Sequence, residues 1–167
     1  MSKAAELTLR MAEFNSMYPA LTQHFVKVHG FASAIGRLEG LDAWTQETLE
    51  LAAIAHDIGI KLCIEKYGKC TGKMQEEEGP SAARPMLASL GIEYAMIDRI
   101  CHLIGHHHTY TSIDGLDYQI LVEADFLVNL HEGNQDDDAK RAAYEKIFKT
   151  TTGKQLFSAM FGTDNGL

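Results

Sequence analysis

The chain has 167 residues, of which 46% are hydrophobic, and it carries a formal net charge of −8 at pH 7. This length is enough for one domain with a sizeable buried core. The acidic balance argues against a general nucleic-acid binder, since phosphate contacts need a basic face, and no apolar run approaches the roughly 18 residues that span a bilayer.

The apolar residues mostly recur three and four positions apart, which is the spacing of amphipathic helices. In chain order, helices are predicted over about 7–17, 21–38, 45–56, 81–90, 92 to the histidine cluster, 118–131 and 136–148, with a short one at 153–161. Residues 60–80 hold scattered lysines, glycines and acidic residues, and we predict a long functional loop there. The expected fold class is all-α, a compact bundle of about six to eight helices.

One domain is expected over residues 1–167. Its core, over about 20–132, would hold the functional site, and 133–167 would form a C-terminal helical extension.

His56 and Asp57 form a doublet at the end of the apolar stretch 51–55. A carboxylate buried there without a partner would cost several kcal/mol, and a metal ion is the simplest partner. The alternative is a helix-terminal histidine followed by an aspartate that is bonded to the backbone.

Asp125 interrupts the most apolar helix predicted for the chain. Buried carboxylates are normally paired or bound to metals. The alternative to a metal is a salt bridge to Arg37 or Arg99. Glu123, two residues earlier, is assigned to the solvated face of the same helix.

His29 lies in the apolar stretch 25–32. A lone histidine on such a face is commonly a core residue with a satisfied hydrogen bond, but the company of the doublet and Asp125 favours a ligand. His24 is not on the same face as His29 and is left out. The predicted ligands of one divalent ion are therefore His29, His56, Asp57 and Asp125. Such a set suits Mn, Fe, Ni, Co or Zn.

The order His, His-Asp, Asp, with the doublet in the segment AIAHDIG, resembles the HD-domain metal-dependent phosphohydrolase family over about residues 20–132. The resemblance implies an HD-type helical bundle that hydrolyses a small phosphate ester or nucleotide by attack of a metal-bound water. Asp57 would then be both a ligand and the base that orients this water.

The run His106-His107-His108 is similar to the paired histidine that binds a second metal in two-metal members of the family. His106 and His107 are expected either to hold a second metal ion or to protonate the leaving oxygen. His108 is assigned no definite role. A polar helix terminus at the pocket mouth is the alternative for the whole run.

Two departures from the family pattern concern the segment after the doublet. Two-metal members usually have a further histidine before the fourth helix, but residues 74–80 have none, although a glutamate of the run 76–78 could substitute. Many members have lysine three residues after the Asp of the doublet, where this chain has Ile60. Lys61, Lys69 and Lys73 are either phosphate contacts or solvated charges.

The three cysteines, Cys63, Cys70 and Cys101, predict reduced thiols in a cytoplasmic protein, because their number is odd and no export signal precedes them. A zinc site built from Cys63, Cys70 and His102 is a further alternative, although its spacing matches no standard pattern.

Three other functions remain open on the sequence alone. The chain could be a catalytically silent sensor that binds metal or a nucleotide, a di-iron oxygenase of the HD type, which needs a full second site, or a structural interaction protein. For the enzyme, the expected partner is a small phosphorylated substrate or nucleotide, without general nucleic-acid or membrane binding. The substrate, the native metal and the oligomeric state are not specified.

Overall fold

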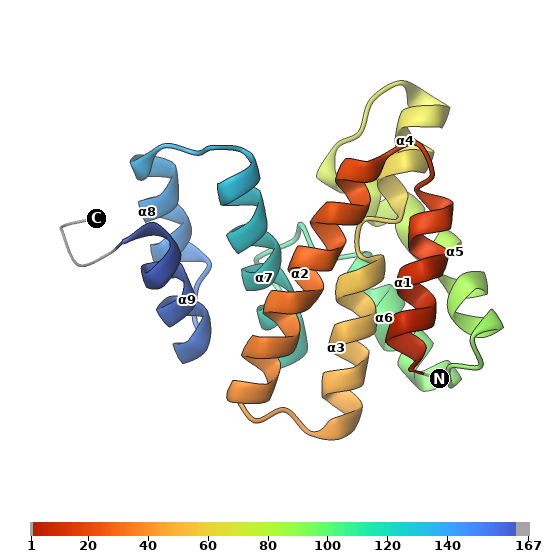
Figure 1. Ribbon diagram of the computed structural model, residues 1–167, viewed down its shortest axis with the longest axis horizontal. Helices are drawn as coiled ribbons and strands as arrows, with labels where there is room; N and C mark the ends of the chain where they lie inside the picture. The colour runs from red at the N-terminus through yellow and green to blue at the C-terminus, as the bar shows by residue number, and fades with distance from the viewer. Residues whose placement is uncertain (1, 163–167) are drawn as a thin grey trace.

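Helices make up all the regular structure that the computed structural model describes, which covers residues 2–162 (Figure 1). In chain order they are α1 (Lys3–Phe14), α2 (Pro19–Leu38), α3 (Ala43–Ala55), α4 (Gly59–Tyr67), α5 (Gly72–Ser89), α6 (Tyr94–Ile104), α7 (Leu116–Glu132), α8 (Asp137–Lys146) and α9 (Thr151–Phe161). The prediction of an all-α fold is confirmed. Part of the expected C-terminal extension, residues 163–167, lies outside the described residues.

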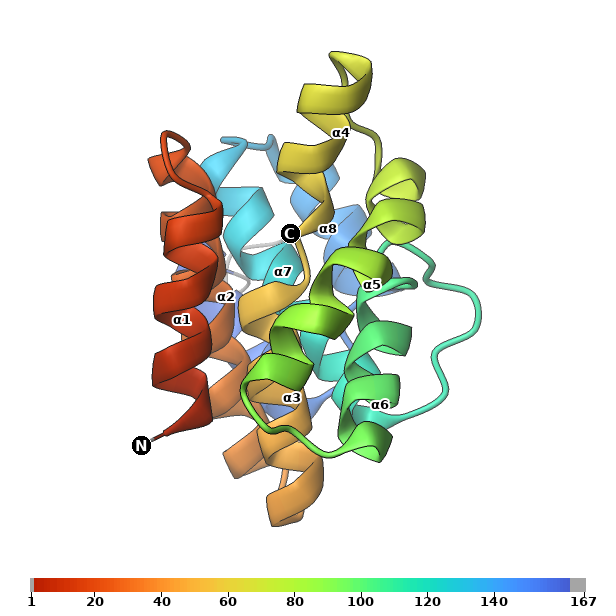
Figure 2. The ribbon, with the colours of Figure 1, turned by 90° about the vertical axis from the view of Figure 1, so that its right-hand side faces the viewer.

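α2, α3 and α7 pack against one another and form the centre of the fold (Figure 1). Residues 51–55 of α3 and 120–125 of α7 are buried without interruption, as expected for helices with neighbours on every side. α1 covers α3 and α2 on one side, while α6 and then α5 cover α3 on the other (Figure 2). α8 and α9 lie beyond α7. Within residues 2–162, no helix combines the length and apolar character that crossing a bilayer needs.

The predicted loop over 60–80 is wrong, because α4 and α5 occupy nearly all of it and only residues 68–71 connect them. The glycines of this segment contributed to the prediction of a loop, yet Gly72 and Gly79 lie within α5, together with Pro80. Gly79 serves close helix packing instead: a Cβ there would lie 2.6 Å from Ile104 Cγ2 on α6. Residues 60–80 are therefore mostly helical; α4 and α5 pack against each other, and α5 packs against α6.

Glu123 is buried in α7, which corrects its assignment to the solvated face. Its Oε1 accepts hydrogen bonds from the backbone N–H groups of Lys149 and Thr150, at 2.6 and 2.9 Å. Gln119 Nε2 donates to the same oxygen at 2.7 Å. The carboxylate thus satisfies backbone donors just before α9 and ties this helix to α7.

Candidate metal centre

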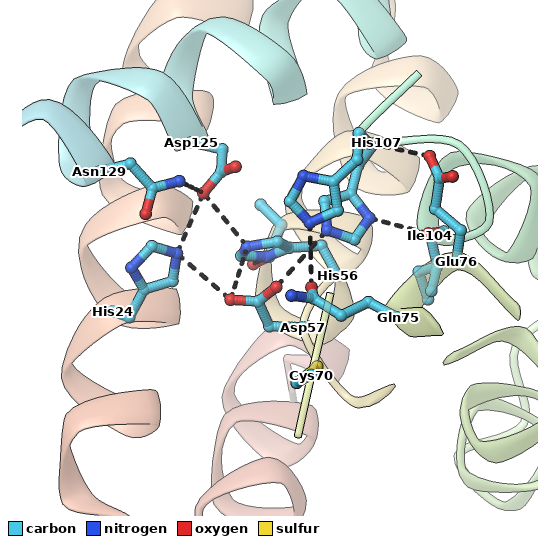
Figure 3. A network of polar contacts seen from close by, with 12 residues as sticks. His24, His56, Asp57, Cys70, Gln75, Glu76, Ile104, His107, Asp125 and Asn129 are labelled. Atoms are coloured by element: carbon cyan, nitrogen blue, oxygen red, sulfur yellow. Dashed lines mark hydrogen bonds and ion pairs between the residues drawn. The ribbon is translucent and has the colours of Figure 1, made fainter. Parts of the chain in front are cut away.

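Four polar side chains from α2, α7 and the end of α3 converge in the interior of the fold (Figure 3). His24 Nε2 lies 3.0 Å from Asp125 Oδ1 and 3.4 Å from Asp57 Oδ2. His56 Nε2 lies 3.3 Å from Asp57 Oδ2 and 3.5 Å from Asp125 Oδ1. Because single ligand atoms of His24, His56 and Asp57 all lie within 4.8 Å of one another, one cation could contact all three.

The doublet faces the interior because it occupies the turn where α3 ends and α4 begins. Adjacent residues inside a helix point about 100° apart, but at this turn both side chains reach the cluster. Gly59, which follows this turn, lets α5 approach closely, since a Cβ there would lie 2.8 Å from Gln75 O on α5. Asp125 lies in the middle of α7, where Asn129 Nδ2 donates to its Oδ1 at 2.8 Å.

His29 does not belong to this cluster, and His24 takes the place that was predicted for it. His29 Nε2 lies 3.6 Å from Glu50 Oε2, and its side chain is 29% exposed. The two histidines are five positions apart on the helix, which places them about 140° apart around its axis. His24 belongs to the buried stripe of α2 that continues at Val28 and Ala32, four and eight residues on. That stripe is the sequence signal that the prediction overlooked.

The histidines around the cluster are oriented by hydrogen bonds at Nδ1. His56 Nδ1 lies 2.9 Å from Ala53 O, and His107 Nδ1 lies 2.8 Å from Ile104 O. A carbonyl only accepts, so each Nδ1 carries the hydrogen and the neutral ring has its lone pair on Nε2. Both Nε2 atoms are buried and have no hydrogen-bond partner within residues 2–162. Metal-binding imidazoles are held in this same way.

The Nδ1 atom of His24, on the side of the ring away from the aspartates, contacts a carboxylate. This atom lies 2.8 Å from Glu132 Oε2, at the end of α7. Glu132 Oε1 in turn lies 2.6 Å from Lys27 Nζ. A proton on Nδ1 would again leave Nε2 facing the aspartates.

The aspartates of the cluster are buried, with Asp57 9% and Asp125 3% exposed. Burial acts to raise the pKa of Asp57, but the neighbouring imidazoles of His56 and His107 hold it well below its usual value. Burial also acts to raise the pKa of Asp125, whereas its hydrogen bond with His24 and the neighbouring imidazole of His56 lower it further than burial raises it. Two buried, ionised carboxylates require positive charge beside them.

A divalent ion fits the residues present. Two carboxylates supply the negative charge, and the Nε2 atoms of His24 and His56 face them, that of His56 without a hydrogen-bond partner in residues 2–162. This mixed set suits the borderline ions Mn, Fe, Co, Ni and Zn.

Asp57 also belongs to a second group of donors, with His107 and His108, whose ligand atoms lie within 4.8 Å of one another. His107 Nε2 lies 3.5 Å from Asp57 Oδ1, while Oδ2 faces His24 and His56. His108 Nε2 lies 3.0 Å from Gln75 Oε1. The carboxylate of Asp57 therefore lies between the two groups. Within the triple histidine, His107 and His108 are the residues that lie next to it.

His106 belongs to neither group of donors, which corrects its assignment as a catalytic residue. Its side chain is exposed and stacks on His102, with ring centroids 4.3 Å apart. Its Nδ1 lies 2.7 Å from His102 O. The turn after α6 directs His107 inward and His106 outward.

The acidic run before Ser81 is committed to other contacts. Glu76 Oε1 accepts from the backbone N–H of His108 at 3.0 Å. Glu77 pairs with Lys73 on the surface, and Glu78 Oε1 lies 2.9 Å from Lys66 Nζ. Gln75 is the α5 side chain that faces the second group, so the run supplies no ligand to either group of the described chain.

The lysines considered as phosphate contacts lie apart from the cluster. Lys61 Nζ donates to Phe14 O at 2.7 Å, which ties α4 to the end of α1. Lys73 is 83% exposed and lies 4.0 Å from Glu77 Oε1. Lys69 is exposed on the connection between α4 and α5. Lys69 and Lys73 agree with the alternative of solvated charges, whereas Lys61 is largely buried and bonded to the backbone.

Two alternatives raised by the sequence are excluded by the geometry. Asp125 does not pair with an arginine: Arg37 lies 3.0 Å from Glu50, and Arg99 lies 2.6 Å from Asp117. The candidate ligand groups of the described residues contain no cysteine, so Cys63 and Cys70 form no zinc site with His102.

Comparison with known proteins yields one informative likeness. No protein-family model matches the sequence, and no curated protein matches it. A crystal structure of a predicted HD superfamily hydrolase from an uncultured Thermotogales bacterium has the same fold, with a TM-score of 0.67. The match covers 93% of this chain and 83% of that chain at 24% sequence identity. The chain therefore shares the helical fold of that protein, in agreement with the fold class that the sequence predicted.

Proposed function

We propose that this protein is a metal-dependent phosphohydrolase that acts on a small phosphate ester. The observation that carries the proposal is the pair of buried, unpartnered Nε2 atoms of His56 and His107 beside ionised aspartates. The fold likeness to a predicted HD superfamily hydrolase supports a hydrolase. The formal charge of −8 favours a small ester over a nucleic-acid polymer.

His24, His56, Asp57 and Asp125 would hold the ion. When bound, a divalent ion lowers the pKa of water and polarises a phosphoryl oxygen. Asp57 has a second task, because its Oδ1 lies on the side of His107, 3.5 Å from Nε2. That oxygen can orient an attacking water and accept its proton.

His107 is the residue placed to move a proton to the leaving group. Its Nδ1 is engaged with Ile104 O, so Nε2 is the atom that takes up and releases a proton. The buried ring holds this atom next to Asp57.

The test is turnover of a panel of phosphate monoesters, diesters and nucleotides with Mn²⁺ or Co²⁺. Activity should disappear with EDTA and return with the ion. Asp125→Asn should lose turnover by at least about a hundredfold, because a charged ligand becomes neutral. Arg141→Ala, an exposed change on α8, is the control.

If the protein binds a stoichiometric ion yet turns over nothing in this panel, the proposal fails. The sensor function, in which the same residues bind metal and a nucleotide without hydrolysis, would replace it.

A further inference from the structure

A cavity of about 450 Å³ lies between α7 and α8, outside the metal centre. Its walls are mainly apolar and include Phe126 and Leu130 from α7 and Ala142 and Ala143 from α8. Lys146 is the charged side chain among the residues that line it. The volume is in the usual range for small-molecule sites, roughly 300–1,000 Å³.

One side chain joins this cavity to the metal centre. Asn129 lines the cavity, and its Nδ2 also donates to Asp125 Oδ1 at 2.8 Å (Figure 3). The two residues are four apart on α7, so they stand one turn apart on one face. Asn129 therefore contacts a proposed metal ligand and also forms part of the cavity wall.

An aromatic pair makes a second connection. The rings of Tyr110 and Phe126 pack edge to face, with centroids 5.3 Å apart. Tyr110 follows His108 by two residues, and its side chain remains 40% exposed. The segment that follows the histidines thus makes an aromatic contact with the cavity wall.

We propose that the α7–α8 cavity binds the apolar part of the substrate, which is then a phosphate monoester of an alkyl or aryl alcohol. This inference rests on the proposed function. A sugar or other polyol would leave hydroxyl groups unpaired against these walls, which is costly. The small side chains of Ala142 and Ala143 leave room for a chain or a flat ring.

The experiment measures kcat/KM with Mn²⁺ for methyl, butyl, hexyl and 1-naphthyl phosphate. In the wild type, kcat/KM should rise with chain length, by up to about fourfold per methylene if each is fully buried. Ala142→Phe fills the cavity and should remove this dependence. Arg141→Phe places the same ring on an exposed position of α8 and should keep it. If Ala142→Phe does not fold, as judged by circular dichroism, Ala139→Phe on the same wall replaces it.

A flat series in the wild type, with the esters still hydrolysed, overturns the subsite and leaves the proposed function intact. If Ala142→Phe instead dissolves a dimer seen by size-exclusion chromatography while the series is flat, the cavity is an interface between copies.

If no ester is hydrolysed, the proposed function fails, and binding of 1-naphthol followed by its fluorescence tests the cavity alone. Binding that weakens at least tenfold in Ala142→Phe and not in Arg141→Phe supports an apolar ligand site. Equal binding by all three proteins rejects it.

Discussion

His24 and His29 both lie on α2, and a variant of each can test which of the two histidines binds the metal ion. His24 faces two buried aspartates, whereas His29 faces Glu50 near the surface. His24→Ala should abolish stoichiometric binding of Mn²⁺ or Co²⁺, and His29→Ala should leave it unchanged. Elemental analysis after dialysis and isothermal titration calorimetry measure this. Full metal content in His24→Ala, with the fold intact by circular dichroism, would contradict the assignment.

Glu132 is expected to act on the metal centre through His24, whose Nδ1 it contacts at 2.8 Å. Partners of this kind fix the tautomer and orientation of a ligand histidine. Glu132→Ala should weaken metal affinity by about 10- to 100-fold, and Glu132→Gln, which still accepts a hydrogen bond, should recover much of it. A competition titration with a metal indicator reports the affinity. Glu77→Ala is the control, since Glu77 is exposed and pairs only with Lys73 in the described chain. Equal affinities of Glu132→Ala and the wild type would rule out this role.

At the scale of helices, the contact between α5 and α6 depends on a position without a side chain. Gly79 and Gly30 both lie inside helices, but a Cβ at Gly79 would meet Ile104 Cγ2 at 2.6 Å, whereas nothing lies within 4 Å of one at Gly30. Gly79→Ala should therefore destabilise the fold by about 1–3 kcal/mol through overpacking. Gly30→Ala should stabilise it by about 0.5–1 kcal/mol, because alanine loses less backbone entropy on folding. Urea unfolding measures both changes, and a stabilising Gly79→Ala would show that the helices can separate without cost.

Across the whole molecule, what the sequence could predict depended on whether the signal was local. Helical periodicity and the polar interruptions at His56, Asp57 and Asp125 are local, and the structure brings these three residues together. The choice between His24 and His29 depends on which stripe of α2 packs inward, which is a tertiary property.

The helices over 60–80 were missed for a related reason. Glycine and proline have the lowest intrinsic helix propensities, so a prediction that ignores tertiary packing does not expect them inside a helix. Here α5 contains both, and its glycine at position 79 admits the neighbouring helix α6. The direction of His106 and His107 likewise depends on the geometry of the turn after α6, which residue type alone does not determine.

The pH dependence of stability should include a contribution from Glu50, away from the metal centre. Burial acts to raise its pKa, but hydrogen bonds from Gln46, Ser33 and Arg37 lower it below the ordinary 4.5. A carboxyl group whose pKa is lowered by folding stabilises the fold above its unfolded pKa, and this stabilisation is lost as the pH falls through the folded value. Between about pH 5 and pH 3, the free energy of unfolding should therefore fall less steeply in Glu50→Gln than in the wild type.

Urea unfolding at a series of pH values measures this slope. Glu47→Gln, an exposed change on the same helix, is the control and should follow the wild type. Parallel curves for Glu50→Gln and the wild type would mean that folding leaves the proton affinity of Glu50 unchanged. A shallower curve for Glu50→Gln alone would place part of the acid sensitivity of the whole molecule in the contact between α2 and α3, where Arg37 lies 3.0 Å from Glu50.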